Sequence, residues 1–145
     1  MMVAARRAMA RLATRPFGRR RAAHLRLGRR GESLVCRVLR RRGFDILARN
    51  YATTRGEIDI VARQDTVLCF IEVKTRRRAV KSTPGEAVGT HKRRAIATAA
   101  KDYLRAIGLP EVPYRFDIAE VILPRRGPID IAYHRAAFVS EDPMS

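Results

Sequence analysis

The spacing of apolar and polar positions predicts helices and strands in the order α-β-β-β-α-β-β. Helices are expected over 28–42 and from about 83 to 107, where apolar residues recur every three or four positions. Strands are expected in short runs that are rich in β-branched and aromatic residues and bounded by turn formers. Their ranges are 44–49, 57–63, 66–74, 114–123 and 129–134.

The run 66–74 is apolar at both odd and even positions, which is typical of a central strand covered on both faces. With the order of elements, this predicts an α/β (α+β) fold in which helices flank a central mixed sheet. A tight turn at Gln64-Asp65 is expected to join the second and third strands. Thr83 and Glu86 have the spacing of a capping box for the second helix, and Thr90 is an alternative cap.

Length and composition limit the class of protein. The chain has 145 residues, the size of one domain, and 46% of them are apolar. No run approaches the roughly 20 apolar residues of a membrane span, so no membrane association is expected. Two cysteines exclude a disulfide framework and a four-thiolate zinc site. We interpret Cys36 and Cys69 as core residues in a reducing cytoplasm, and therefore expect a cytoplasmic protein.

The formal net charge is +17, and most of it lies in residues 1–42, which hold 14 arginines and one acid. A chain this basic is expected to bind polyanions. Residues 1–27 are expected to form a disordered or loosely helical basic arm, residues 28–138 the folded domain and residues 139–145 a frayed tail. The arm is interpreted as a phosphate-binding segment or, equally well, as a solvated tail or an overlong start; a transit peptide ranks last.

Charged residues at the ends of the second and third strands form the candidate site. If Arg63 pairs with Thr66, Asp59 faces Phe70 and lies diagonal to Glu72, about 7–8 Å away on the same face. Carboxylates that share a site repel one another, and Mg²⁺ removes that repulsion while keeping several of its waters. Lys74 projects to the same face, where it can orient a water or stabilise charge on a phosphate.

A plain Glu-Lys pair at a strand end is the structural alternative, but the coincidence of Asp59, Glu72 and Lys74 favours a site. Glu32 is placed by helical periodicity on the inward side of the first helix, where it can approach the same site. Its alternative role is that of an acid near a helix N-terminus. Lys92 is interpreted with equal weight as a side chain that snorkels from the core edge or one that reaches a phosphate.

This arrangement resembles the PD-(D/E)xK nuclease superfamily, in which one strand carries an acid and the next carries acid-x-lysine. More closely, the chain resembles the uncharacterised bacterial YraN-like family over about residues 28–138. The blocks that carry the likeness are residues 31–32, 49–51, 56–60 (GEIDI), 70–76 (FIEVKTR) and 115–117.

The resemblance implies a restriction-endonuclease-like αβββαβ core, similar to that of Holliday-junction resolvases. By motif, Asp59, Glu72 and the carbonyl of Val73 would bind Mg²⁺ or Mn²⁺. Lys74 would activate water, and Glu32 would be the helix-borne acid. Ile58 stands where the superfamily name has proline.

We therefore expect a metal-dependent endonuclease that acts on DNA, including branched or damaged DNA. The alternatives are a non-catalytic nucleic-acid-binding module and an RNA- or ribosome-associated basic protein. A two-fold homodimer would suit junction DNA. The expected contacts to nucleic acid are Arg29, Arg30, Arg76 and Lys92. Asp117 is expected to be structural.

Overall fold

The order of elements agrees with the prediction. The computed structural model describes residues 19–83, 86, 88–108 and 111–140. No helix within these ranges is long and apolar enough to cross a bilayer. The elements are α2 (Arg19–Arg41), β1 (Asp45–Ala52), β2 (Glu57–Gln64), β3 (Val67–Arg76), α4 (Thr90–Ala106), β4 (Tyr114–Ile122) and β5 (Asp130–Phe138).

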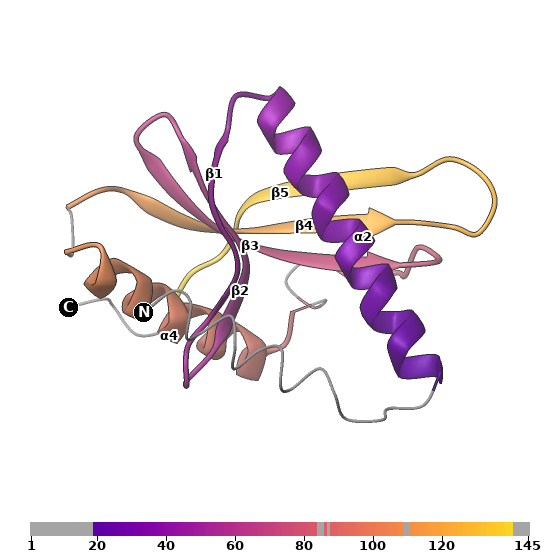
Figure 1. Cartoon of the computed structure of the whole chain (residues 1–145), viewed down its shortest axis with the longest axis horizontal. Coiled ribbons are helices and arrows are strands. Elements are labelled where there is room, and N and C mark those ends of the chain that lie inside the picture. The colour runs from indigo at the N-terminus through magenta and orange to yellow at the C-terminus, as the bar shows by residue number, and fades with distance from the viewer. Residues whose placement is uncertain (1–18, 84–85, 87, 109–110, 141–145) are drawn as a thin grey trace.

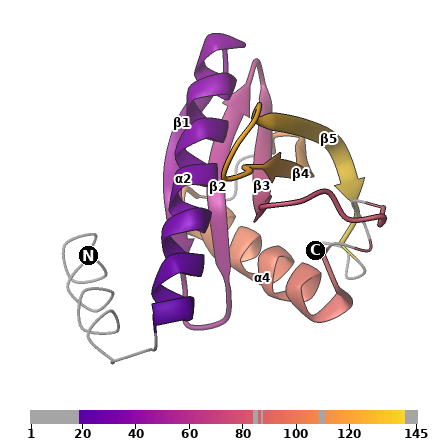
Figure 2. The same cartoon turned by 90° about the vertical axis from the view of Figure 1, so that its right-hand side faces the viewer.

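The strands form one mixed sheet in the order β1-β2-β3-β4-β5. β3 and β4 are parallel and joined through α4, whereas the other neighbouring strands are antiparallel. β3 is therefore the central strand, as its two-sided apolar pattern predicts. Helix α2 covers one face of the sheet and α4 the other (Figures 1 and 2). The α/β class is confirmed and is consistent with a restriction-endonuclease-like core.

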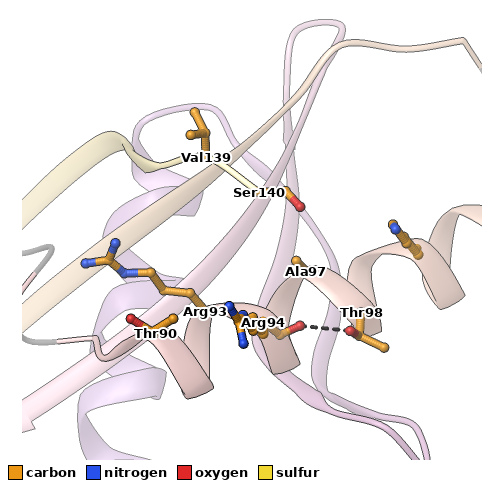
Figure 3. Close-up of a pocket in the computed structure, with 8 residues that line it drawn as sticks. Thr90, Arg93, Arg94, Ala97, Thr98, Val139 and Ser140 are labelled. Atoms are coloured by element: carbon orange, nitrogen blue, oxygen red, sulfur yellow. Dashed lines mark hydrogen bonds between the residues drawn. The ribbon is translucent and has the colours of Figure 1, made fainter. Parts of the chain in front are cut away.

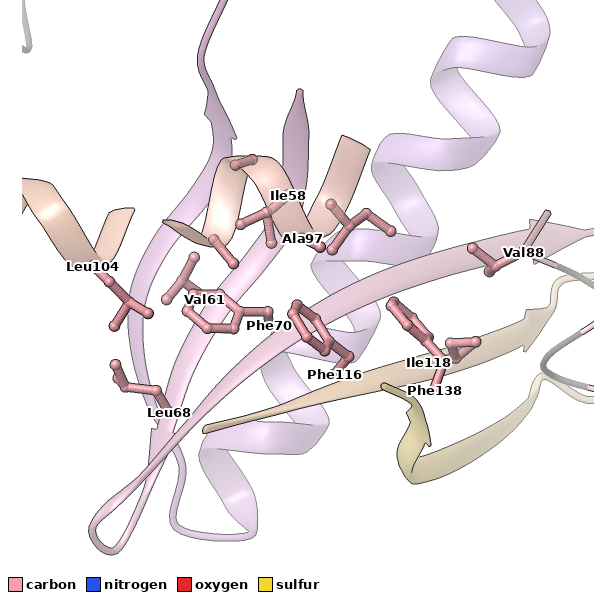
Figure 4. Packing of buried hydrophobic residues seen from close by; sticks show 13 residues of the cluster. Ile58, Val61, Leu68, Phe70, Val88, Ala97, Leu104, Phe116, Ile118 and Phe138 are labelled. Carbon is pink, nitrogen blue, oxygen red and sulfur yellow. The ribbon is translucent and has the colours of Figure 1, made fainter. Parts of the chain in front are cut away.

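Each face of the sheet has its own hydrophobic core. On the α4 side, Phe70, Phe116 and Phe138 form a row across β3, β4 and β5 (Figure 4). Their successive ring centroids lie 5.7 and 5.0 Å apart, within the range of favourable aromatic pairs. On the α2 side, Cys36 and Cys69 are buried free thiols in the apolar cluster, which confirms their prediction as core residues.

Helix α2 begins at Arg19 instead of residue 28, so that boundary was wrong. Residues 19–27 of the expected arm belong to the helix, and residues 1–18 lie outside the described residues. Arginine, alanine and leucine are all strong helix formers, and Leu27 is buried in the α2-side core, so the helix continues back from its packed half. At the other end, β5 extends to Phe138, the expected end of the folded domain.

The predicted register of the β2–β3 hairpin was also wrong. Gln64 pairs with Val67, so the turn is Asp65-Thr66, and Phe70 pairs with Val61 instead of Asp59. Asp65 has a φ of 53°, a left-handed conformation that aspartate tolerates better than most residues. The side chain of Asp65 therefore favours the turn one position later than expected.

The capping box forms, but it does not start α4. The Thr83 N–H donates to Glu86 Oε2 at 2.8 Å, and the Glu86 N–H donates to Thr83 Oγ1 at 3.2 Å. Helix α4 begins at Thr90 after Gly89, whose extended backbone takes the N-cap position without a side-chain cap. Thr90 is thus the first helical residue and not the cap. Ile107, expected on the apolar stripe, follows the helix and is exposed.

Candidate active site

A break in the pairing of β2 and β3 positions the first carboxylate, Asp59. The ladder ends at the pair Ile60–Ile71, and at the next step the Asp59 Oδ2 accepts a hydrogen bond from the Val73 N–H at 2.9 Å. The alternation of β2 is interrupted here, because Ile58 packs on the α4 side and Ile60 on the α2 side. Asp59 therefore lies where the two strands separate, between the two faces of the sheet.

The second carboxylate, Glu72, lies on β3 one step beyond the last ladder pair, level with Asp59. Its side chain is only 8% exposed, and its Oε1 is 3.4 Å from Lys92 Nζ on α4. Burial and the negative charge of Asp59 raise the pKa of Glu72 to about 8, although Lys92 opposes the shift. The two acids are therefore closer than the predicted diagonal arrangement, because the true register places them side by side.

The third carboxylate, Glu32, reaches the group from helix α2. A Cβ built at Gly31 would lie 1.8 Å from Thr75 Oγ1, so only glycine lets the helix approach β3 this closely. Burial and the charge of Asp59 raise the pKa of Glu32 to about 7, against a hydrogen bond from Asn50 that lowers it. The predicted inward orientation of Glu32 is confirmed by this coupling to Asp59.

A fourth carboxylate, Glu57, completes the group. Partial burial and Asp59 raise its pKa, and Lys92 lowers it. Asp59 thus raises the pKa of Glu32, Glu57 and Glu72 alike. We call these four residues, Glu32, Glu57, Asp59 and Glu72, the carboxylate cluster.

Lys74 is half-buried and follows Glu72 on the same face of β3. It lines a pocket with Arg76 and with Glu120 of β4, its partner in the parallel ladder. Within the described residues, Lys74 makes no hydrogen bond or ion pair. The described lining of this pocket includes Asp130 as well as Glu120 and none of the residues of the carboxylate cluster, so Lys74 shares the face of Glu72 but faces a separate pocket.

The cluster fits a divalent cation with few protein ligands. The Oε2 atoms of Glu32 and Glu72 are buried without a hydrogen-bond partner among the described residues, and such atoms are costly unless a ligand satisfies them. No group of three His, Cys, Asp or Glu residues in the described parts of the chain is arranged as a metal site. The residues that could hold a cation are therefore at most one or two of these carboxylates, which is the number that Mg²⁺ typically takes from a protein while it keeps several waters.

The four expected nucleic-acid contacts lie in different surroundings. Arg29 and Arg30 are exposed on α2 shortly before Glu32, whereas Arg76 is half-buried at the end of β3. Lys92 is engaged with Glu72, and attraction to Glu72 and Asp59 outweighs the effect of burial and raises its pKa. Lys92 therefore lies beside the cluster. This position is compatible with both roles that the sequence suggested, a side chain that snorkels from the core edge and a contact to a phosphate.

Three neighbouring residues were missed from the sequence. Asn50, at a φ of 50°, bonds to Glu32, and its position inside an otherwise regular strand was the available signal. On the α4 face, His134 Nε2 lies 3.1 Å from Glu120 Oε2, beside the Lys74 pocket. Only the β3–β4–β5 register brings this pair near Lys74, so no local spacing could have indicated it.

Fold and site together define an α/β protein with carboxylates gathered where two central strands separate and a lysine two residues beyond Glu72 on the same face of β3. The chain belongs to the uncharacterised protein family UPF0102, whose pattern matches residues 31–121 and so spans Glu32, Asp59, Glu72 and Lys74. This membership confirms the YraN-like resemblance.

Similar proteins carry the same family name. The UPF0102 protein of Anaeromyxobacter sp. (strain Fw109-5) is 41% identical over 114 residues, which cover 79% of this chain and 85% of the relative. The UPF0102 protein of Syntrophotalea carbinolica is 48% identical over 103 residues, which cover 71% and 82%. That of Chlorobium phaeobacteroides (strain BS1) is 48% identical over 96 residues, which cover 66% and 76%.

Proposed function

We propose that this protein is a metal-dependent nuclease that hydrolyses phosphodiester bonds in DNA. The observation that carries the proposal is the position of Asp59, which couples to carboxylates from α2, β2 and β3 at one point. These groups repel one another, and the charge of Lys92 offsets only part of that repulsion, because the pKa values of Glu32, Glu57 and Glu72 all remain raised. A divalent cation bound by these carboxylates would remove the remaining repulsion and could take a phosphate oxygen as a further ligand.

The residues have separate roles in this proposal. Asp59, Glu72 and the carbonyl of Val73 would hold Mg²⁺ or Mn²⁺. The bound cation would supply Lewis-acid activation of the phosphate and of a water. Lys74 would orient that water or stabilise charge that develops on the phosphate. Glu32 would hold a second water through its buried Oε2.

The choice of DNA as substrate rests on charge. The net charge of +17 favours a polyanion, and Arg29 and Arg30 are exposed near the cluster. The same arginines favour the second candidate function, a nucleic-acid-binding protein without catalysis, acting on DNA or as an RNA- or ribosome-associated protein. A cleavage assay distinguishes the nuclease from the non-catalytic binding protein.

The test is cleavage of labelled duplex, single-stranded and four-way-junction DNA, and of RNA, with Mg²⁺, Mn²⁺ or EDTA. Wild type is expected to cut DNA only with a cation, and Asp59→Asn to abolish cutting. Asp65→Asn is the matched control, because it makes the same change at the exposed turn of the same hairpin. It is expected to cut like wild type.

Other outcomes reject the proposal. Tight, strongly salt-dependent binding without cutting under any cation would support the non-catalytic module. Preferential binding to RNA without cutting would support the RNA-associated protein. Equal cutting by wild type and Asp59→Asn would indicate a contaminating nuclease.

A further inference from the structure

An arginine-rich surface lies where the parallel strands β3 and β4 end. β3 ends at Arg76 and β4 at Ile122, and these two residues are partners in the last step of the parallel ladder. The segments that follow therefore leave the sheet at the same end, on the right-hand side of Figure 1. Residues 76–80 and 122–130 together hold five arginines and one acid, Asp130. We call four of these arginines the arginine rim: Arg76, Arg78, Arg125 and Arg126.

Two hydrogen bonds tie the two segments of the rim together. The Leu123 N–H donates to the Arg76 carbonyl at 2.8 Å. The Arg77 guanidinium donates to the Leu123 carbonyl at 3.2 Å. These bonds hold the starts of both segments side by side, so the arginines that follow are carried close to one another before any ligand binds. Such a prearranged group of cations has less order to gain, and so loses less free energy, when it binds an anion.

The positive charge of the rim is available to a ligand. Arg78, Arg125 and Arg126 are exposed, and Arg76 is half-buried. Their side chains form no hydrogen bond or ion pair within the part of the chain that the structure describes. Asp130 lines the same pocket as Arg76, but it is a single acid against five arginines. The surface therefore keeps a net positive charge.

The face of β3 that carries Glu72 leads to the rim. Alternate residues of a strand lie on the same face, so Glu72, Lys74 and Arg76 share one. The residues between them face the other way, because Val73 packs on the α2-side core and Thr75 lies against Gly31 of α2. The ladder of β3 with β4 runs through this stretch without a bulge. The row that starts at the carboxylate cluster therefore ends at the rim.

The length of this row matches a short piece of DNA. Four residues separate Glu72 from Arg76, a distance of roughly 13 Å at about 3.3 Å per residue. A DNA duplex advances about 3.4 Å along its axis for each nucleotide of a strand. A duplex that lies along β3 with one phosphate at the cluster would therefore bring a phosphate about four nucleotides away to the rim.

The basic residues of helix α4 belong to a different surface. Arg93, Arg94 and Lys101 line a pocket between α4 and the residues that follow β5, in which the Thr98 hydroxyl donates to the Arg94 carbonyl at 2.8 Å (Figure 3). The Arg93 Nε is already bonded to the Val88 carbonyl at 2.8 Å. This pocket shares no lining residue with the carboxylate cluster or with the pocket that contains Arg76. The rim, unlike the α4 pocket, adjoins the face of β3 that carries Glu72.

We propose that the arginine rim binds the phosphate backbone of the DNA whose scissile phosphate lies at the carboxylate cluster. Guanidinium groups suit this role, because each can pair with two oxygens of one phosphate. The inference rests on the proposed function for its substrate. It adds a binding surface formed by the segments that follow β3 and β4, and the task of this surface is to position the DNA, not to take part in the chemistry.

The test is binding of the full-length protein to a fluorescein-labelled DNA duplex in EDTA, measured by fluorescence anisotropy across a range of salt concentrations. Arg78→Gln/Arg125→Gln removes one charge from each segment of the rim. It is expected to weaken binding roughly tenfold and to make the slope of log K against log salt shallower by about 2, because each lost phosphate contact removes about 0.9.

Arg40→Gln/Arg41→Gln is the matched control, because it removes the same charge from two exposed positions. These arginines lie in the last turn of α2, just before β1 and therefore at the end of the sheet where β3 begins. The control is expected to bind DNA like wild type. Arg78→Lys/Arg125→Lys keeps both charges of the rim and is expected to retain the salt slope of wild type. Thermal melts establish that each variant is folded.

Three results would overturn the inference. They are equal weakening by the rim and control glutamine variants, no weakening by the rim glutamine variant, and an equal loss in the lysine and glutamine variants of the rim.

The outcome is separable from nuclease activity, because binding is measured without a cation. If wild type never cuts but the rim variant loses binding selectively, the surface stands and the proposed function fails. If wild type cuts and the rim variant binds normally, the function stands and the surface fails.

Discussion

At the scale of single residues, Asp59 organises the site because β2 and β3 separate at its position. Its carboxylate replaces a ladder contact by accepting from the Val73 N–H, and its charge raises the pKa values of three neighbouring acids. One aspartate thus supports the local backbone and, in the proposed function, would also be a ligand of the cation.

Glu72→Gln should stabilise the metal-free protein at high pH. The raised pKa keeps Glu72 protonated up to about pH 8 in the folded protein, whereas the same group in the unfolded chain ionises near its ordinary pKa of 4.5. Because the folded state then binds more protons, stability falls as pH rises through this window. Glutamine removes that cost, so the variant should gain about 2 kcal/mol or more over wild type between pH 5 and pH 8, at about 1.4 kcal/mol per pKa unit.

Urea unfolding in EDTA at the two pH values measures the gain, with the exposed Glu111→Gln as control. A difference between Glu72→Gln and wild type that stays constant with pH would contradict the burial and charge assigned to Glu72.

Asp117→Ala should destabilise the fold without a specific effect on the site. Asp117 is fully buried, and its carboxylate accepts from Arg115, the Tyr133 hydroxyl and the Ala136 N–H. This network supports the structural role predicted for Asp117. Removing the acid leaves a partly buried guanidinium unpaired, so a loss of about 3–5 kcal/mol is expected in urea unfolding.

The exposed Asp45→Ala is the control for Asp117→Ala and should cost little, because the ion pair of Asp45 with Arg63 is exposed to solvent. DNA cleavage per folded molecule should be unchanged in both variants. A selective loss of cleavage in Asp117→Ala would place this acid in the site.

At the scale of elements, the close approach of α2 to β3 brings Glu32 to the cluster. Gly31→Ala should force the helix away, because the new Cβ would lie 1.8 Å from Thr75 Oγ1 and 2.9 Å from Thr75 Cβ. We expect a loss of about 1–3 kcal/mol from overpacking and reduced cleavage. Gly28→Ala, on the same helix, meets nothing within 4 Å and should instead gain up to about 1 kcal/mol from helix propensity.

Thermal melts and cleavage assays of the two alanine variants make this comparison. Equal stability of the two would show that α2 does not contact β3 at Gly31.

Helices and strands were predictable from the sequence where the apolar pattern extended over many residues. They were not predictable where a single contact sets the boundary or the register of an element. The two-sided apolar run placed β3 at the centre, and periodicity oriented Glu32. The start of α2 was missed because burial of Leu27 depends on the sheet, not on local spacing. The hairpin register depended on the left-handed conformation of Asp65, and the pair Glu120–His134 on strand order. The start of α2, the hairpin register and the Glu120–His134 pair are all set by the tertiary structure and not by local sequence.

At the scale of the whole molecule, the basic excess lies mostly in residues 1–42. Residues 1–18 hold four arginines and no acid. Deleting them should weaken DNA binding and make the salt slope shallower by about 3 to 4, because the loss is electrostatic. Maximal cleavage at saturating DNA should be unchanged.

The deletion must stop at residue 18, because Leu27 belongs to the core. Anisotropy and single-turnover cleavage of the truncated protein test this. Complete loss of binding would favour the alternative in which the arm itself is the functional part.

The central claim is that the carboxylate cluster and Lys74 cut DNA, and its most direct test is single-turnover cleavage with Mn²⁺ by wild type, Lys74→Ala and Lys81→Ala. Lys74 follows Glu72 by two residues on the same face of β3, whereas Lys81 is exposed in the following loop. Wild type and Lys81→Ala should cut at the same rate, and Lys74→Ala should be slower by about 10²–10⁴-fold, the range for loss of an acid–base group. Failure of wild type to cut, or equal rates for Lys74→Ala and wild type, would contradict the claim.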